Sequence, residues 1–334
     1  MTVTVLAGGV GAARFLTGLV QALGSTDDDP SITVIGNTAD DLRLFGLQVC
    51  PDLDSVMYTL GNGQDRERGW GRADESFTVL EELRAYGATP DWFNLGDRDF
   101  ATHILRTQML DAGYSLDIVT AALCQRWKVP VRLIPMSNDR VETHVAVLDP
   151  NSDEPVALHF QEWWVRHHAK LAAKAFMVVG VEDATPARGV LQAIAEADVV
   201  ILPPSNPVVS IGPILQVPGI RDALAATSAP IIGVSPIVGG APVRGMADAC
   251  LSAIGVRTSA AAVAAHYGTR SFGGLLDGWV IDTRDQDDVA RICDSGIRCV
   301  ATDTMLDDPS VAQSVAEVAL AIAADIRAGS TGPR

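Results

Sequence analysis

The chain is poor in positive charge, and this shortage argues against two large classes of function. Its 25 lysine and arginine residues face 41 aspartate and glutamate residues, which gives a formal net charge of −16. A nucleic-acid-binding protein needs a basic face for the phosphates, and a protein that docks on anionic lipid needs clustered cations. We therefore expect no nucleic-acid partner and no membrane partner. Any phosphate-bearing ligand must be held locally, by backbone amides, a few arginines or a metal ion.

The sequence also lacks paired cysteines, a signal peptide and a long apolar run. Its 5 cysteines are odd in number and include no C-x-x-C pair, which favours reduced core thiols. The first residues show no basic region followed by an apolar one, and no apolar run reaches the length of a membrane span. We therefore expect a cytoplasmic protein.

Short β-branched segments alternate with helical segments along most of the chain. Apolar residues make up 48% of the 334 residues, enough for a large buried core. This order predicts an α/β fold with a Rossmann-like, doubly wound and mostly parallel sheet. We expect residues 1–60 and 175–328 to form the nucleotide-binding core. A mainly helical insertion with a few antiparallel strands, residues 61–174, should cover the active site, and residues 329–334 should form a disordered tail.

The expected elements follow from this pattern. The strands are expected at residues 2–6, 32–35, 131–134, 143–148, 156–160, 177–179, 199–202, 231–234, 280–282 and 299–302. The main helices are expected at residues 12–23, 51–60, 74–86, 99–112, 115–127 and 309–328. The three strands between residues 131 and 160 look antiparallel, and regular alternation returns from Phe176.

The first expected strand leads into Gly8-Gly9-Val10-Gly11 and then into a helix. Glycines let the backbone approach a phosphate, and the following helix directs its N-terminal amides at it. The spacing is neither G-x-G-x-x-G nor a Walker A sequence, so a tight turn without a ligand explains the loop about as well. Arg14, one turn into the helix, favours an anion.

Acidic residues gather after the second expected strand, where open α/β sheets keep their ligands. Asn37, Asp40 and Asp41 are followed by Asp52 and Asp54. Carboxylate and amide oxygens suit Mg²⁺, which takes one or two protein carboxylates together with substrate phosphates. Capping of a helix explains one or two of these carboxylates but not all of them.

The segment Leu95–Asp99 (LGDRD) carries a second group of charges. Its two aspartates can hold Arg98 as a fork for a phosphate or a planar ring. For His103, a helix-surface histidine is a slightly better explanation than a catalytic one.

Two loops follow apolar strands in the second half of the chain. Ser205-Asn206-Pro207, continuing to Gly212, comes just after the strand at 199–202, and Ser235–Pro242 comes after the strand at 231–234. Small hydroxyls and an asparagine at the end of a buried strand favour a rigid nucleotide loop over a proline-rich connector.

Together these segments resemble the 2-phospho-L-lactate transferase family, of the CofD and FbiA type. Each segment alone is modest, but their joint presence in order is specific. The resemblance covers roughly residues 3 to 310. The matching segments are Ala7–Leu19, Asn37–Leu60, Trp70-Gly71-Arg72, Leu95–His103, Ser205–Leu215 and Ser235–Pro242.

The resemblance implies a Rossmann-like homodimer and a Mg²⁺-dependent phosphotransferase in the synthesis of the deazaflavin coenzyme known as factor 420. The terminal ribityl hydroxyl of the deazaflavin Fo would attack the phosphorus next to the lactyl or enolpyruvyl group of a guanosine-diphosphate-linked donor. GMP would leave. Arg14, where archaeal members tend to have Pro-Lys, is similar to the actinobacterial branch that uses the enolpyruvyl donor.

The resemblance also implies roles for the residues in the matching motifs. The predicted catalytic residues are Asp54, Asp40 and Arg98, and the predicted Mg²⁺ ligands are Asp40, Asp41 and Asp54. The predicted Fo contacts are Asp54, Trp70, Arg98, Thr102 and His103. The predicted contacts of the guanosine diphosphate are Gly8, Gly9, Gly11, Asn37, Ser205, Asn206, Ser210 and Gly212.

Two other functions stay open on the sequence. A non-catalytic, nucleotide-sugar-binding metabolic regulator of the same fold would share the glycine loop and the Ser-Asn-Pro loop. We expect that branch to lack the Trp-Gly-Arg and Gly-Asp-Arg-Asp segments, which are both present here. A Rossmann dehydrogenase would need strict G-x-G-x-x-G spacing and an acidic residue at the end of the second strand, where this chain has Gly36-Asn37. The transferase is therefore favoured, with the regulator as the alternative.

Overall fold

A computed structural model describes residues 1–25, 31–65, 68–150 and 152–330 of the chain. Its centre is a seven-stranded sheet in the order β14-β13-β10-β9-β1-β2-β5, with parallel pairing throughout. The strands are β1 (Val3–Ala7), β2 (Ile32–Gly36), β5 (Arg132–Pro135), β9 (Val199–Leu202), β10 (Ile231–Val234), β13 (Gly278–Asp282) and β14 (Arg298–Thr302).

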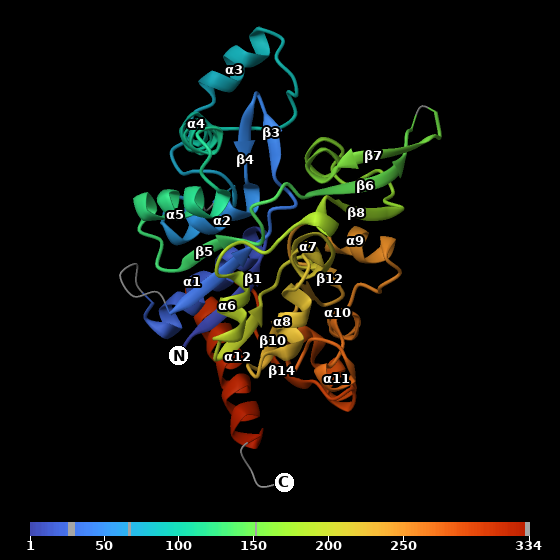
Figure 1. Cartoon of the computed structure of the whole chain (residues 1–334). Helices are drawn as coiled ribbons and strands as arrows, with labels where there is room; N and C mark the ends of the chain where they lie inside the picture. The colour runs from blue at the N-terminus through green and yellow to red at the C-terminus, as the bar shows by residue number, and fades with distance from the viewer. Residues whose placement is uncertain (26–30, 66–67, 151, 331–334) are drawn as a thin grey trace.

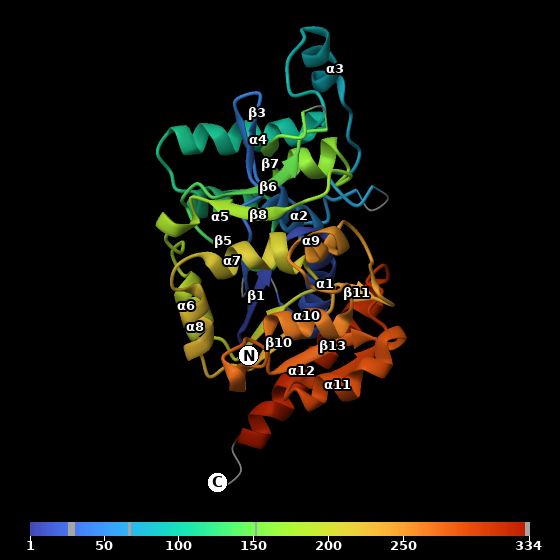
Figure 2. The ribbon, with the colours of Figure 1, turned by 90° about the vertical axis from the view of Figure 1, so that its right-hand side faces the viewer.

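Helices cover both faces of this sheet (Figures 1 and 2) because its strands are apolar on both sides. One face packs against α1 (Gly9–Leu23), α2 (Pro51–Leu60), α5 (Leu116–Trp127) and α12 (Pro309–Ser330). The other packs against α6 (Val190–Ala195), α7 (Gly212–Gln216), α8 (Ile220–Ala226), α10 (Ala260–Tyr267) and α11 (Val289–Asp294). The predicted α/β fold is confirmed.

β1 and β9 are neighbours at the point where the order of the strands reverses. From β1 the chain continues to β2 and β5 on one side, and from β9 to β10, β13 and β14 on the other. The connections after such a pair run to opposite faces and leave a crevice beyond the strand ends, where ligands bind in folds of this type. The glycine loop follows β1, and the 203–206 segment follows β9.

A second layer lies over this end of the sheet and occupies the upper part of Figure 1. It contains the hairpin of β3 (Leu42–Leu44) and β4 (Leu47–Val49), followed by α3 (Thr78–Ala85) and α4 (Asp97–Asp111). It also contains an antiparallel sheet in the order β7-β6-β8, made of β6 (Glu142–Leu148), β7 (Pro155–His159) and β8 (Ala175–Val179).

The smaller elements complete the rim of the crevice. Two π-helical turns lie there, η1 (Glu162–Arg166) after β7 and η3 (Pro207–Ile211) after β9. After β10 come the short strands β11 (Ile237–Val238) and β12 (Ala241–Pro242), and then α9 (Ala247–Ala253). The 3₁₀ turns are η2 (Val181–Asp183), η4 (Arg270–Phe272) and η5 (Thr283–Asp288).

Two strands differ from the sequence-based expectation. β5 pairs parallel with β2 in the central sheet, although residues 131–134 were expected in an antiparallel group within the 61–174 insertion. β8 pairs antiparallel with β6 outside the central sheet, although residues 177–179 were expected in the core. Both are short apolar runs, and the partner of such a run is decided by tertiary packing rather than by its own pattern.

α12 differs in two respects from the expectation. It ends at Ser330 rather than at residue 328, and residues 331–334 of the expected tail lie outside the described residues. Within the described residues it is also the one helix long and apolar enough to cross a membrane, although no such run was expected. The helix packs along α1, where a Cβ added at Gly18 would lie 2.1 Å from the carbonyl carbon of Ala312. This face of the helix is therefore packed against α1.

Candidate functional site

A cavity of about 830 Å³ lies between the end of the central sheet and the second layer. The loops after β1, β9 and β10 line one side of it, and α2, α4, η1 and the Trp70 segment line the other. The predicted site residues that line it are Gly8, Gly9, Gly11, Asp40, Asp54, Trp70, His103, Ser205, Asn206 and Ser210. The predicted residues outside its lining are Asn37, Asp41, Arg98, Thr102 and Gly212.

Two glycines of the first loop allow close contacts that a side chain would block, and the third has a backbone conformation that favours glycine. A Cβ on Gly8 would lie 2.6 Å from Cβ of Ser210 and 2.7 Å from Oδ2 of Asp52. A Cβ on Gly11 would lie 2.3 Å from the carbonyl oxygen of Pro204. Gly9 has φ of +72°, a backbone conformation that residues with a side chain rarely adopt. The loop therefore brings bare backbone against the β9 loop and the floor of the cavity.

Ser205 joins the two loops at the crevice. Its hydroxyl donates to the Gly8 carbonyl oxygen at 2.9 Å and accepts from the Gly8 N–H at 3.4 Å. Asn206 caps η3, because its Oδ1 accepts from the N–H groups of Val208 (2.9 Å) and Val209 (3.3 Å). Gly212 begins α7, further from the cavity. The Ser-Asn-Pro segment is thus a rigid loop fixed to the glycine loop.

Asp40 and Asp52 form a pair of buried carboxyls on the cavity wall. Burial, and then the charges of Asp52 and Asp41, raise the pKa of Asp40 well above its usual range. Burial raises the pKa of Asp52 to about 6, against hydrogen bonds from Asn37 and the Gly9 backbone that lower it. Asn37 donates to Asp52 Oδ2 at 2.9 Å. Among the described residues, Oδ1 of Asp40 finds no hydrogen-bond partner.

Asp41 lies outside this pair, buried beside Cys50, and burial raises its pKa well above the usual range. Across the described residues, no group of three or more histidine, cysteine or acidic side chains could hold a metal ion. Asp40, Asp41 and Asp54, predicted as the Mg²⁺ ligands, are therefore not gathered into one ligand set. The structure instead places Asp40 near Asp52, which was not among the predicted Mg²⁺ ligands.

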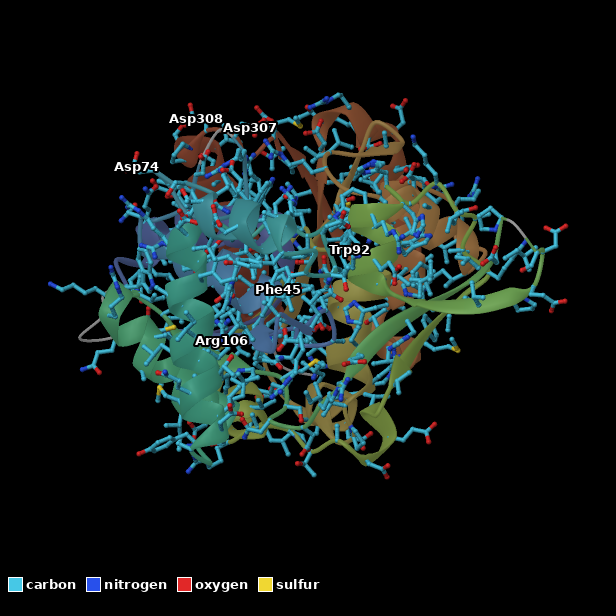
Figure 3. The ribbon with its side chains drawn as sticks, turned by 90° about the horizontal axis from the view of Figure 1, so that it is seen from above. Phe45, Asp74, Trp92, Arg106, Asp307 and Asp308 are labelled. Carbon is cyan, nitrogen blue, oxygen red and sulfur yellow. The ribbon has the colours of Figure 1, made fainter. Side chains whose placement is uncertain are left out.

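Asp54 is held by a buried arginine. Arg106 Nη1 donates to its Oδ2 at 3.0 Å, and Nη2 donates to its Oδ1. Arg106, labelled in Figure 3, is 1% exposed. Its Nη1 also contacts Nδ1 of His103 at 3.0 Å. Burial lowers the pKa of His103 to about 4, so this ring is neutral near pH 7. Both oxygens of Asp54 are therefore engaged within the protein.

Arg98 does not reach the cavity. It is exposed on the first turn of α4, and its carbonyl oxygen accepts from Arg72 Nη1 at 2.9 Å. The next residue, Asp99, is 5% exposed and lines the cavity instead. Thr102, one turn further along α4, is buried near Tyr58. The predicted contact of Arg98 with a ligand therefore has no support in this geometry.

Several other described residues line the cavity, and most of them carried no recognised signal in the sequence. They include three arginines: Arg14, which was expected to favour an anion, and Arg68 and Arg244, which were not singled out. Arg14 pairs with Asp307, which lies at the molecular edge in Figure 3, and Arg244 approaches the same carboxylate at 3.7 Å. Tyr58, Trp164 and His168 also line it. Trp164 and His168 come from η1 and the residues after it, in the second layer, which the residue pattern did not connect with the nucleotide loops.

One side of the cavity carries aromatic rings. Trp70 is 42% exposed, and the Arg68 guanidinium carbon lies 5.3 Å from the centre of its ring. Phe93 lines the cavity too, as do Phe160 and Trp164 from the segment that follows β7. Aromatic faces with a guanidinium beside them suit a planar, conjugated ligand.

The chain matches known proteins over its full length. Residues 3–319 match the family described as 2-phospho-L-lactate transferase CofD. A Streptomyces coelicolor protein named phosphoenolpyruvate transferase is 60% identical, over 98% of this chain and 99% of that protein. A Thermobifida fusca protein of the same name is 58% identical, over 98% of this chain and 99% of that protein. A Mycobacterium protein of the same name is 53% identical, over 97% of this chain and 99% of its own length.

Solved structures show the same fold. Two crystal structures of a Bacillus halodurans protein superpose with TM-scores of 0.61 and 0.58 at 19% identity. The alignments cover 96% of this chain and 99% or 98% of the other. The family match and the curated relatives make this protein a phosphotransferase. The chain belongs to the 2-phospho-L-lactate transferase CofD family.

Proposed function

We propose that this enzyme transfers a phosphoenolpyruvyl group from a guanosine-diphosphate-linked donor to the ribityl hydroxyl of the deazaflavin Fo and releases GMP, in the synthesis of factor 420. One observation supports this most: a single cavity of about 830 Å³ joins a glycine loop at the sheet crevice to a wall of aromatic and ionisable side chains. Such a cavity can hold a diphosphate and a planar acceptor at once. The names of the relatives favour the enolpyruvyl donor over the lactyl one.

The donor's diphosphate would lie on the glycine loop. Gly8, Gly9 and Gly11 leave the backbone bare at the start of α1, where N–H groups and the helix dipole favour an anion. Ser205 fixes this loop to the β9 loop through the Gly8 backbone. Arg14 and Arg244 lie at the rim of the cavity, paired with Asp307. The diphosphate would replace this carboxylate as their partner.

Asp40 and Asp52 fit the Mg²⁺ that the reaction would use. They are two buried carboxyls, one oxygen of Asp40 lacks a partner among the residues that the structure describes, and the charge of Asp52 raises the pKa of Asp40. A divalent cation between them would remove that repulsion, and Mg²⁺ accepts two carboxylates with the remaining positions for phosphate oxygens and water. Bound there, the ion would neutralise charge on the diphosphate.

The deazaflavin would lie between the second layer and α2. Trp70, Phe93 and Trp164 offer ring faces, and Arg68 offers a cation. Phosphoryl transfer depends mainly on positioning and on neutralising charge. Placing the ribityl hydroxyl in line with the donor phosphorus is therefore the main task of this wall.

A reconstituted assay tests the proposal. Purified protein, Fo and Mg²⁺ are mixed with enolpyruvyl or lactyl diphosphoguanosine, and products are followed by chromatography and mass spectrometry. We expect GMP and a phosphodiester-linked deazaflavin in equal amounts, only with Mg²⁺ present, and faster with the enolpyruvyl donor. GMP without the deazaflavin product would indicate hydrolysis and would reject the transfer.

The alternative is the non-catalytic, nucleotide-sugar-binding regulator. The aromatic and carboxyl-lined half of the cavity has no role in that function, because a nucleotide sugar needs no planar acceptor site. Stabilisation by UDP-sugars rather than guanosine nucleotides in a thermal unfolding assay, with no product from either donor, would favour the regulator. A cytoplasmic location and a homodimer are part of the proposal, and light scattering on the purified protein tests the dimer.

A further inference from the structure

Asp99 lines the cavity but has no role in the function proposed above. It lies on the first turn of α4 and is 5% exposed. Within the described residues, its Oδ1 has no hydrogen-bond partner. A buried carboxyl with a free acceptor atom is costly to fold unless a ligand completes it.

The Trp-Gly-Arg segment runs directly over this carboxyl. A Cβ added to Gly71 would lie 3.6 Å from Asp99 Oδ2, and Gly71 has φ of +69°. Trp70, the neighbour of Gly71, lines the same cavity. The ring wall assigned to the deazaflavin and the free carboxyl are thus adjacent, so a hydroxyl on the chain of that ligand can reach Asp99.

The other carboxyl on this wall is less able to accept a proton. Asp54 accepts from both Nη atoms of Arg106, and an arginine does not give up its proton. No arginine in the part of the chain that the structure describes holds Asp99 in this way. Resting on the proposed function, we propose that Asp99, not Asp54, accepts the proton of the ribityl hydroxyl during transfer.

In the proposed step, the hydroxyl oxygen forms a bond to the donor phosphorus next to the enolpyruvyl group, and the bond from that phosphorus to the bridging oxygen of GMP breaks. GMP leaves with the bonding electron pair, and the hydroxyl proton passes to the Asp99 carboxylate. Solvent takes this proton after product release.

The surroundings of Asp99 suit a base near neutral pH. Burial raises its pKa to about 7, with further upward contributions from the charges of Asp54 on α2 and of Glu75, which follows the Trp-Gly-Arg segment. The Tyr58 hydroxyl on α2 and the Arg72 guanidinium lower it. The folded-state pKa is raised, so the ionised, proton-accepting form gains population as pH rises through about 7.

Asp99→Asn tests this role, because the amide keeps the shape and cannot accept the proton. We expect kcat to fall by about 10²- to 10⁴-fold, the usual range for a general base. The rise of kcat with pH should disappear, while the affinity for GDP, measured by calorimetry, should stay within about twofold. Asp97→Asn is the matched control: Asp97 lies two residues earlier, outside the cavity lining, and bonds Ser76 and the start of α3. That variant should keep the wild-type pH profile.

Asp99→Glu provides a second test in case the asparagine variant fails to fold. It restores a carboxylate, so it should recover part of kcat, and this kcat should again rise with pH. If the kcat of Asp99→Asn stayed within about threefold of the wild-type value and still rose with pH, the role of Asp99 alone would be overturned. Absence of transfer by the wild-type enzyme would overturn the proposed function, and this role with it.

Discussion

Replacing Asp54 by asparagine would leave the charge of Arg106 buried without a counterion. Arg106 is 1% exposed, and its guanidinium contacts both oxygens of Asp54. Arginine cannot become neutral by losing a proton. Removing one partner of a buried ion pair costs about 3 to 5 kcal/mol. We therefore expect Asp54→Asn to lower the free energy of unfolding by about this amount, at acidic and alkaline pH alike.

The reverse substitution, Arg106→Met, should behave differently with pH. It leaves the buried carboxyl of Asp54, which can become neutral by binding a proton. In this variant the folded state binds that proton more tightly than the unfolded chain does. The stability that the bound proton contributes is present at low pH and is lost as pH rises. The variant should therefore be less destabilised at about pH 5 than at about pH 8.

Urea unfolding, followed by far-ultraviolet circular dichroism at both pH values, measures these differences. The control is Asp111→Asn, which breaks the contact of Asp111 with Arg43 at 4.0 Å, where the side chains are 66% and 59% exposed. An exposed pair of this kind is worth less than about 1 kcal/mol. If Asp54→Asn matched the stability of wild type and still lost all turnover, the structural role argued for Asp54 would be refuted, and its direct role in chemistry would be restored.

Further predictions concern the two halves of the donor site. Gly11→Ala would put a Cβ 2.3 Å from the Pro204 carbonyl oxygen, so GDP affinity in calorimetry should fall at least about tenfold. Gly329→Ala is the control and should leave the affinity unchanged, because no described residue lies within 4 Å of a Cβ added there. Asp40→Asn or Asp52→Asn should weaken Mg²⁺ binding, measured by titration in the presence of GDP, and an unchanged affinity would exclude this pair as the metal site. In the wild type, Mg²⁺ binding should strengthen as pH rises through about 6, where the raised pKa of Asp52 lies, because the metal needs the ionised carboxylate.

The sequence predicted the crevice well because its signals are local. A β-branched run followed by three glycines, and a buried strand followed by Ser-Asn-Pro, each report a strand end directly. The bounds of α2, β9 and β10 are confirmed at residues 51–60, 199–202 and 231–234. Their meeting in one crevice follows from the order of parallel strands.

The assignment of particular side chains was harder, because it depends on helix phase and distant partners. Residues two apart on a helix point in nearly opposite directions, and adjacent ones differ by about 100°. Asp52 faces the glycine loop, whereas Asp54 meets Arg106, which lies 52 residues further along. On α4, Asp99 lines the cavity and Arg98 is exposed. The motif alone could not distinguish these neighbours.

The most direct test of the central claim follows phosphorus through the reaction by ³¹P nuclear magnetic resonance, with the products identified by mass. The proposed reaction predicts that the two coupled diphosphate signals of the enolpyruvyl donor give way to equal signals from GMP and from a phosphodiester joining Fo to enolpyruvate. A deazaflavin product that carried guanosine instead, or donor signals unchanged in the presence of Fo and Mg²⁺, would contradict it.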